Sequence, residues 1–181
     1  MLLEREQSCV LLIDVQEKLA PHVRESEKLL ARCAWIIRLA TELKVPLLVS
    51  EQYPKGLGST IEPLKSLVSH AQCSEKVHFS CCRDPSFVQN LEVLKKKQLV
   101  LIGIETHVCV LQTAMELHKA GYEIFVVVDA VSSRAEIDHK YGLKRMKQAG
   151  IQLITAEMVF FEWVGQAGTE AFKVLSKTYL R

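Results

Sequence analysis

Residues 99–128, LVLIGIETHVCVLQTAMELHKAGYEIFVVV, decide the fold of this chain. Two short apolar runs rich in branched side chains, at 99–104 and 124–128, flank a segment in which apolar residues recur at helical spacing. Runs of this length with almost no polar residue are typical of strands that are buried on both faces, and the spacing between them favours an amphipathic helix. The stretch therefore predicts a strand, a helix and a second strand.

The same alternation extends over the rest of the chain. Further strands are predicted at 9–13, 45–49 and 151–154, and further helices at 29–43, 84–96 and 135–149. Asp84 is the expected N-cap of the second of these helices, and Gly150 closes the third. Because right-handed crossovers place helices on both faces of a parallel sheet, we expect a three-layer α/β/α fold. No repeat or flexible linker divides the chain, which predicts a single domain over residues 1–181.

Composition and charge exclude several classes of protein. The 23 basic and 21 acidic residues are mixed along the chain and leave a formal charge of +2, so a nucleic-acid partner is not expected. The first apolar run is interrupted by Asp14, which argues against a signal peptide or a membrane segment. The six cysteines lack C-x-x-C spacing and the density of a disulfide scaffold, so a reducing, cytoplasmic location is expected.

The stretch at 51–60 is the least regular part of the chain. It reads EQYPKGLGST and contains Pro54, Gly56 and Gly58 directly after the second predicted strand. These residue types predict a mobile or sharply turned loop at the carboxyl end of a strand. Open α/β sheets bind their ligands at that edge.

Three residues at the ends of predicted elements could carry chemistry. Asp14 ends an apolar strand, Cys109 lies in the first turn of a helix, and Lys76 lies in the short alternating piece SEKVHFS. The helix end and a nearby cation would both favour a thiolate at Cys109. Each residue also has an ordinary interpretation: Asp14 as a cap, Cys109 as a small buried residue and Lys76 as a solvated surface cation. Together they supply a base, a nucleophile and a cation.

The chain resembles the isochorismatase-like cysteine hydrolases, and most closely the YcaC-like branch. The resemblance is carried by five blocks: LLIDVQEKL (11–19), SEQYPKGLGST (50–60), EKVHFSC (75–81), GIETHVCVLQTAMELHKAGY (103–122) and VVVDAVSSR (126–134). It implies a Rossmann-like fold with a six-stranded parallel sheet and a catalytic triad of Asp14, Lys76 and Cys109. It also implies a non-proline cis peptide between Ile104 and Glu105, with the N–H groups of Glu105 and Cys109 forming an oxyanion hole.

The activity that the resemblance implies is hydrolysis of a small amide or related C–N substrate through a thioester on Cys109, without an organic cofactor. Tyr53, Phe79 and Thr106 are the expected substrate contacts. Nicotinamidases of this superfamily carry a D-x-H metal pair after the second strand, whereas the matching stretch here reads Ser50, Glu51, Gln52, Tyr53. No metal site is therefore expected.

Relatives of this branch form dimers and larger rings, so we expect a homo-oligomer. The apolar tail MVFFEWV (158–164) is interpreted as a strand followed by a contact surface, with core packing as an equal explanation. Two other functions are open at this stage: a binding or scaffold protein with an idle site, and a thiol redox sensor that uses Cys109 with Cys81 or Cys82. The sequence does not identify the substrate.

Overall fold

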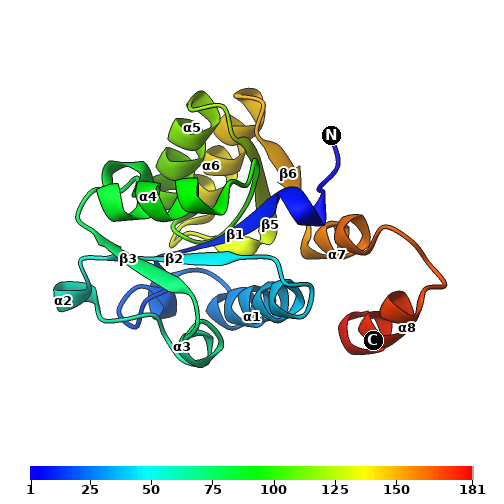
Figure 1. Cartoon of the computed structure of the whole chain (residues 1–181). Helices are drawn as coiled ribbons and strands as arrows, with labels where there is room; N and C mark the ends of the chain where they lie inside the picture. Colours follow the sequence, from blue (N-terminus) through cyan, green and yellow to red (C-terminus); the bar gives the residue numbers. More distant parts are fainter. Residues whose placement is uncertain (181) are drawn as a thin grey trace.

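The computed structural model describes residues 1–180 and consists of a parallel sheet with helices on both faces (Figure 1). The strands are β1 (Ser8–Ile13), β2 (Leu47–Gln52), β3 (Gln72–Lys76), β4 (Gln98–Ile104), β5 (Glu123–Ser132) and β6 (Gln152–Ile154). The helices are α1 (Ser26–Glu42), α2 (Pro54–Leu57), α3 (Leu64–Leu67), α4 (Pro85–Leu94), α5 (Leu111–Lys119), α6 (Glu136–Gln148), α7 (Ala156–Val164) and α8 (Glu170–Tyr179). The predicted three-layer fold with six parallel strands is confirmed.

The order of the strands creates a switch point at the centre of the sheet. The order is β3-β2-β1-β4-β5-β6, so β1 pairs with β2 on one side and with β4 on the other. In Figure 1, α1 lies below the sheet while α4, α5 and α6 lie above it, so the chain leaves β1 and β4 toward opposite faces. Ligands of open α/β sheets bind at the carboxyl ends of the strands where this divergence occurs.

The central strands are buried on both faces, as their apolar sequences predict. All six residues of β1 are buried, and its side chains alternate between two cores. Val10 and Leu12 pack in the core that includes α1 and α7, whereas Leu11 and Ile13 pack in the core that includes α4 and α5. Each fully buried side chain of this kind contributes about 1.5–3 kcal/mol to folding.

Several helix boundaries follow local signals in the sequence. The carboxylate of Asp84 accepts a hydrogen bond from the N–H of Phe87 at 2.8 Å, which confirms Asp84 as the N-cap of α4. The helix ends at Leu94, before the predicted limit of residue 96, because Lys95 adopts a left-handed conformation with φ 52°. Gly150 follows α6 with φ 90°, as expected for a helix stop.

The apolar tail is a helix, so its interpretation as a strand is wrong. Residues 158–164 belong to α7, whose first turn is capped by the side chain of Thr155. Val159, Phe160 and Trp163 are buried on one face of this helix, a spacing that suits a helix rather than a strand. A short apolar run does not by itself distinguish the two structures.

The stretch after β2 is more ordered than its composition suggests. Glu51 and Gln52 complete β2, and Tyr53 turns the chain sharply into α2 with φ 38°. The SEKVHFS piece is a strand only as far as Lys76. Within residues 1–180, no helix is long and apolar enough to cross a membrane.

Candidate functional site

Asp14 follows β1 directly and lies at the switch point of the sheet. Its backbone is left-handed, with φ 53°, and its side chain is completely buried. The N–H of Asp14 donates to the carbonyl of Ser50 at 3.1 Å, and its own carbonyl accepts from the N–H of Gln16 at 2.9 Å. These two backbone hydrogen bonds fix the turn from which the Asp14 carboxylate projects.

Gly103 allows β4 to approach β1 just before Asp14. It pairs with Ile13 and has φ 117°, a conformation that side chains disfavour. A Cβ at this position would lie 2.1 Å from the carbonyl oxygen of Ile13. Only glycine therefore fits at this point of β4. Here β1 leads into Asp14, and β4 leads into the turn that contains Cys109.

Lys76 and Asp14 form an ion pair in the interior. The ammonium of Lys76 lies 2.6 Å from Oδ2 of Asp14, and the two side chains are 1% and 0% exposed. Nζ of Lys76 also donates to Oε1 of Gln52 at 2.7 Å, and Oγ of Ser50 donates to Oδ1 of Asp14 at 2.8 Å. Both charges are thus compensated by hydrogen bonds, as buried charges require.

Cys109 lies in the Cys109 turn, the π-helical turn of residues Thr106–Val110 between β4 and α5. Its thiol is buried and close enough to Asp14 and Lys76 for their charges to shift its pKa. Burial, followed by the negative charge of Asp14, raises the pKa of Cys109 above its usual value, and Lys76 only partly opposes this. Lys76 thus favours the thiolate, as expected, while burial and Asp14 favour the protonated thiol more strongly.

The two charged neighbours of Cys109 have complementary protonation properties. Burial raises the pKa of Asp14, against the opposing effects of Lys76, Cys109 and Ser50, so this carboxylate is a stronger base than usual. Burial alone would lower the pKa of Lys76, but the charges of Asp14 and Cys109 outweigh it and raise that pKa. A permanent cation beside a strengthened base suits proton transfer from a thiol.

Glu105 connects β4 to the Cys109 turn. The peptide bond between Ile104 and Glu105 is cis, at the position that the resemblance implies. The carbonyl of Glu105 accepts from the N–H groups of Val108 at 3.0 Å and Val110 at 3.2 Å. Within residues 1–180, the N–H of Glu105 itself has no hydrogen-bond acceptor.

The opposite side of the Cys109 turn is held by α6 and by the segment that leads into it. Oγ1 of Thr106 and Nδ1 of His139 are 2.9 Å apart, and Nδ1 of His107 is 3.0 Å from Oγ of Ser133. Gly142 packs so closely that a Cβ there would lie 3.1 Å from Cα of His107. The position of the turn therefore depends on α6.

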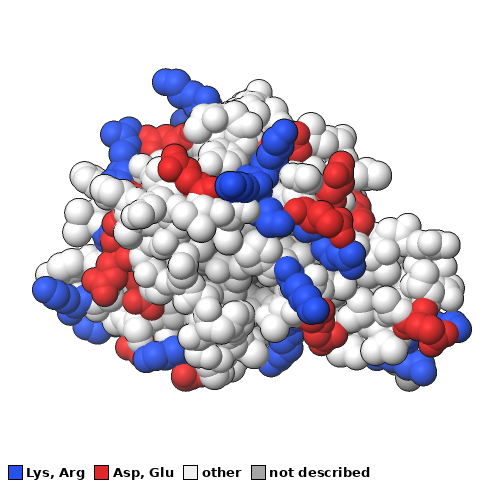
Figure 2. All heavy atoms as spheres, in the orientation of Figure 1, with Lys and Arg blue, Asp and Glu red and all other residues white. Residues whose placement is uncertain are grey.

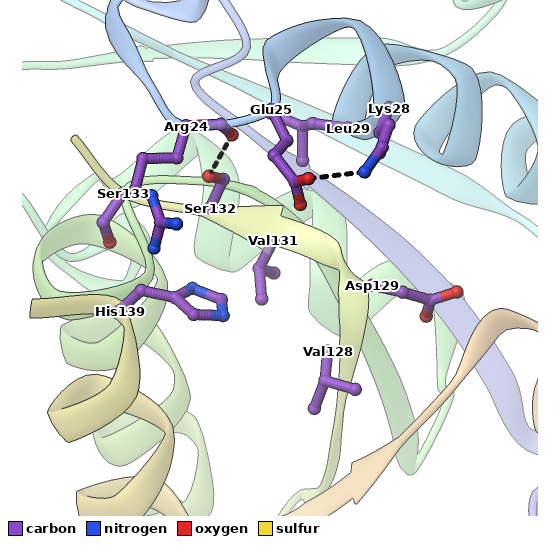
Figure 3. A pocket seen from close by; sticks show the side chains of 10 residues that line it. All are labelled: Arg24, Glu25, Lys28, Leu29, Val128, Asp129, Val131, Ser132, Ser133 and His139. Carbon is purple, nitrogen blue, oxygen red and sulfur yellow. Dashed lines mark hydrogen bonds and ion pairs between the residues drawn. The ribbon is translucent and has the colours of Figure 1, made fainter. Parts of the chain in front are cut away.

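His139 also borders a small cavity between β5, α1 and α6. Its volume is about 130 Å³, and Figure 3 shows His139, Arg24 and Ser133 together at one side with Asp129 at the other. Burial lowers the pKa of His139, which favours a neutral imidazole. The charged groups have ion-pair partners, Arg24 with Glu136 and Asp129 with Arg32.

The three predicted substrate contacts lie in different surroundings. Tyr53 is 53% exposed and lines a cavity of about 440 Å³ to which Lys76 also contributes. Phe79 is equally exposed. Thr106 is fully buried and its hydroxyl is paired with His139. Their contact with substrate stays a prediction.

Three residues around the ion pair are not among the predicted site residues: Ser50, Gln52 and Cys81, the last of which is predicted only as a possible disulfide partner of Cys109. In the sequence, Ser50 and Gln52 stand where related enzymes carry a metal motif, but two polar residues at the carboxyl end of an apolar strand are themselves a signal of a site. Cys81 is fully buried, and its Sγ lies 3.4 Å from Oγ of Ser50. Nothing in the local sequence indicates that contact. All six cysteines are free, so no disulfide joins Cys109 to Cys81 or Cys82.

Comparisons with known proteins identify the family of this chain and several relatives. Residues 8–158 match the family model described as the Isochorismatase domain. Isochorismatase domain-containing protein 2A of Mus musculus is 37% identical over 174 residues, which cover 95% of this chain and 82% of the mouse protein.

Two solved structures are similar over most of their length. The structure described as MAR1 ribonuclease from Caenorhabditis elegans has 36% sequence identity and a TM-score of 0.93, covering 100% of this chain and 93% of its own. The YcaC gene product of Escherichia coli, described as an octameric hydrolase of unknown specificity, has 29% identity and a TM-score of 0.87, covering 92% and 83%.

Proposed function

Because the chain belongs to the isochorismatase family of hydrolases, we propose that it cleaves a small amide or related C–N substrate through a thioester on Cys109. The observation that carries this proposal is the buried ion pair of Lys76 and Asp14, 2.6 Å apart, beside the Cys109 thiol. A nucleophile, a base and a fixed cation meet at the switch point of the sheet. This is the set of groups that acyl transfer requires.

In the first half of the reaction, Asp14 accepts the thiol proton as the sulfur of Cys109 attacks the substrate carbonyl. The developing oxyanion is stabilised by N–H groups of Glu105 and Cys109. The C–N bond then breaks, the leaving amine takes the proton from Asp14, and an acyl thioester remains on Cys109. Lys76 keeps its positive charge throughout. It stabilises whichever neighbour is negatively charged, the Asp14 carboxylate or the Cys109 thiolate.

In the second half, Asp14 takes a proton from water and the resulting hydroxide attacks the thioester. The C–S bond breaks, the carboxylic acid leaves, and the proton on Asp14 returns to the Cys109 thiolate. The site is then back in its starting state. The raised pKa of Asp14 suits both proton transfers, since a base works best when its pKa approaches the working pH.

The proposal is tested with a panel of small primary amides, with ammonia release and acid-quenched intact mass as the two measurements. We expect ammonia release and a transient mass increase equal to the acyl group, both absent from the Cys109→Ala variant. Cys33→Ala is the matched control, because Cys33 is a buried thiol in the other core. The proposal fails if no amide yields ammonia or an adduct and iodoacetamide does not modify Cys109.

RNA is a second candidate substrate, because the similar protein from Caenorhabditis elegans is described as a ribonuclease. The charge pattern favours a small substrate instead. On the face shown in Figure 2, basic and acidic side chains are interspersed rather than gathered into a basic tract. Cleavage of a fluorescent single-stranded RNA by the unaltered protein, but not by Cys109→Ala, would overturn the amide proposal.

We further propose that the protein is a homo-oligomer of the cytoplasm. Met158 and Phe161 on α7 are each 49% exposed, and the N–H of Leu3 donates to Glu162 at 2.6 Å, which brings the apolar N-terminus beside this helix. The similar protein from Escherichia coli is described as octameric. Light scattering of the purified protein tests the assembly, and a monomer at micromolar concentration would contradict it.

The two other functions considered from the sequence predict different results. A scaffold with an idle site would bind ligands with Cys109 unreactive toward electrophiles. A redox sensor would form a disulfide from Cys109 to Cys81 or Cys82 on mild oxidation, detectable by peptide mapping. Amide turnover that survives in the double variant Cys81→Ala/Cys82→Ala excludes both as the principal function.

A further inference from the structure

The two residues of the ion pair come from opposite sides of a strand, β2, that contributes no triad residue. Asp14 follows β1 and Lys76 ends β3, while β2 lies between these two strands. Since neighbouring strands are about 4.8 Å apart, the backbones that carry the two charges are roughly 10 Å apart. Ser50 of β2 pairs with Ile13 and Gln52 pairs with Lys76, so the carboxyl end of β2 lies directly beneath the ion pair.

Ser50 contacts the aspartate side of the pair. Its hydroxyl is buried and donates to Oδ1 of Asp14 at 2.8 Å, while Lys76 occupies Oδ2. The thiol of Cys81 donates to Oγ of Ser50 at 3.4 Å. Because Ser50 accepts from Cys81, its own hydrogen is directed to the carboxylate. This hydrogen bond favours the charged form of Asp14.

Gln52 contacts the lysine side of the pair. Its Oε1 accepts from Nζ of Lys76 at 2.7 Å, and its Nε2 donates to the carbonyl of Val77 at 2.9 Å. The second bond fixes which end of the amide faces the ammonium. Its backbone N–H donates to Gln16 at 2.6 Å, so the residue is held at both ends. Lys76 thus has two fixed acceptors, Asp14 and Gln52.

We propose that Ser50 and Gln52 are positioning residues of the hydrolase site, acting through Asp14 and Lys76 rather than on the substrate. This inference rests on the proposed function and adds two residues to it. Ser50 stabilises the Asp14 carboxylate, so that the shared proton stays on the Cys109 sulfur until a substrate arrives. Gln52 holds the Lys76 ammonium where its charge acts on both Asp14 and Cys109.

The Ser50 contribution is tested by the rate of Cys109 alkylation with iodoacetamide between pH 5 and pH 10, followed by peptide mass spectrometry. Ser50→Ala removes one hydrogen bond to a charged group, so the proton moves toward Asp14 and alkylation near pH 7 becomes about tenfold faster. In an Asp14→Asn background the same change has no effect, because the carboxylate that Ser50 stabilises is gone. A merely structural role would not produce this dependence.

The Gln52 contribution has the opposite sign. Gln52→Met keeps the length of the side chain but removes the acceptor, so the ammonium pivots about Asp14 and alkylation near pH 7 slows by about threefold. Gln89→Met is the matched control, since Gln89 is exposed on α4. Urea unfolding of each variant checks that the alkylation rates are those of folded proteins.

The possible outcomes separate the two proposals. Faster alkylation of Ser50→Ala that disappears with Asp14→Asn, together with slower alkylation of Gln52→Met, supports the positioning roles. If either variant matches the unaltered protein, or the Ser50→Ala effect persists without Asp14, the positioning roles are overturned while the hydrolase proposal stands. If Cys109 of the unaltered protein does not react at any pH, both proposals fail.

Discussion

The Lys76 ammonium lies 2.6 Å from the Asp14 carboxylate, and the two side chains are 1% and 0% exposed. A pair of this kind gives little net stability, because both charges lose their hydration, but it is costly to break. The effect of the pair is therefore to be sought in a third group, the Cys109 thiol. Burial raises the pKa of the Cys109 thiol; of the two charges, Asp14 raises it further and Lys76 lowers it, so the pair acts on this thiol in opposite directions.

Removing the negative charge should make Cys109 more reactive while abolishing hydrolysis. In Asp14→Asn the thiol loses the carboxylate that raises its pKa and keeps the cation that lowers it. We expect alkylation of Cys109 by iodoacetamide at pH 7 to become about tenfold faster. Amide turnover should fall to background because no base remains. An unchanged or slower alkylation rate would show that Asp14 does not act on the thiol.

Removing the cation should have the reverse effect on the thiol and a large effect on stability. Lys76→Met leaves a buried carboxylate without its counter-ion, which should lower the free energy of unfolding by about 3–5 kcal/mol. The pKa of Cys109 should rise further, and alkylation near pH 7 should slow. Urea denaturation and the alkylation assay measure the two effects.

The double variant Asp14→Asn/Lys76→Met controls for the altered packing that the Lys76→Met change causes. It removes both charges, so it should be more stable than Lys76→Met alone. Equal stability of the two variants would show that the cost arises from packing rather than from an unpaired charge.

Gly103 should be the least replaceable glycine of the site. In Gly103→Ala the new Cβ would meet the Ile13 carbonyl at 2.1 Å, so β4 must move away from β1 and the free energy of unfolding should fall by roughly 3 kcal/mol or more. Gly121→Ala is the matched control, because Gly121 also has a positive φ, 94°, but no atom within 4 Å of the added Cβ. It should cost only about 1 kcal/mol. Similar losses in both variants would contradict the close approach.

Buried thiols should make the protein less stable at alkaline pH. Burial raises the pKa of Cys9 to about 12, whereas an unfolded cysteine has a pKa of about 8.5. Between these values the unfolded state loses a proton that the folded state keeps, so stability falls by up to about 1.4 kcal/mol per pH unit. Urea unfolding under reducing conditions at pH 7.5 and pH 10 measures the fall, which should be smaller in Cys9→Ala. Parallel behaviour of the two proteins would exclude this contribution.

The class of fold and most of its elements could be predicted from the order of the residues along the chain. The apolar run 99–104 predicts a buried strand and lies within β4, and Asp84 is the expected N-cap and does begin α4. Both are local properties, because a strand buried on two faces must be apolar throughout and a cap satisfies the N–H groups of its own first turn. The resemblance placed Asp14, Lys76 and Cys109 in one site by motif.

The effects of these residues on one another could not be predicted in the same way, because they depend on contacts between distant segments. Strand order placed β2 beneath the ion pair and so brought Ser50 and Gln52 into the site, and packing made the run 158–164 a helix. The local sequence around Cys109 favoured a thiolate, yet burial and the Asp14 charge raise the pKa of that thiol. The physical reason is that periodicity and capping depend on neighbours along the chain, whereas desolvation and charge are summed over groups from distant segments.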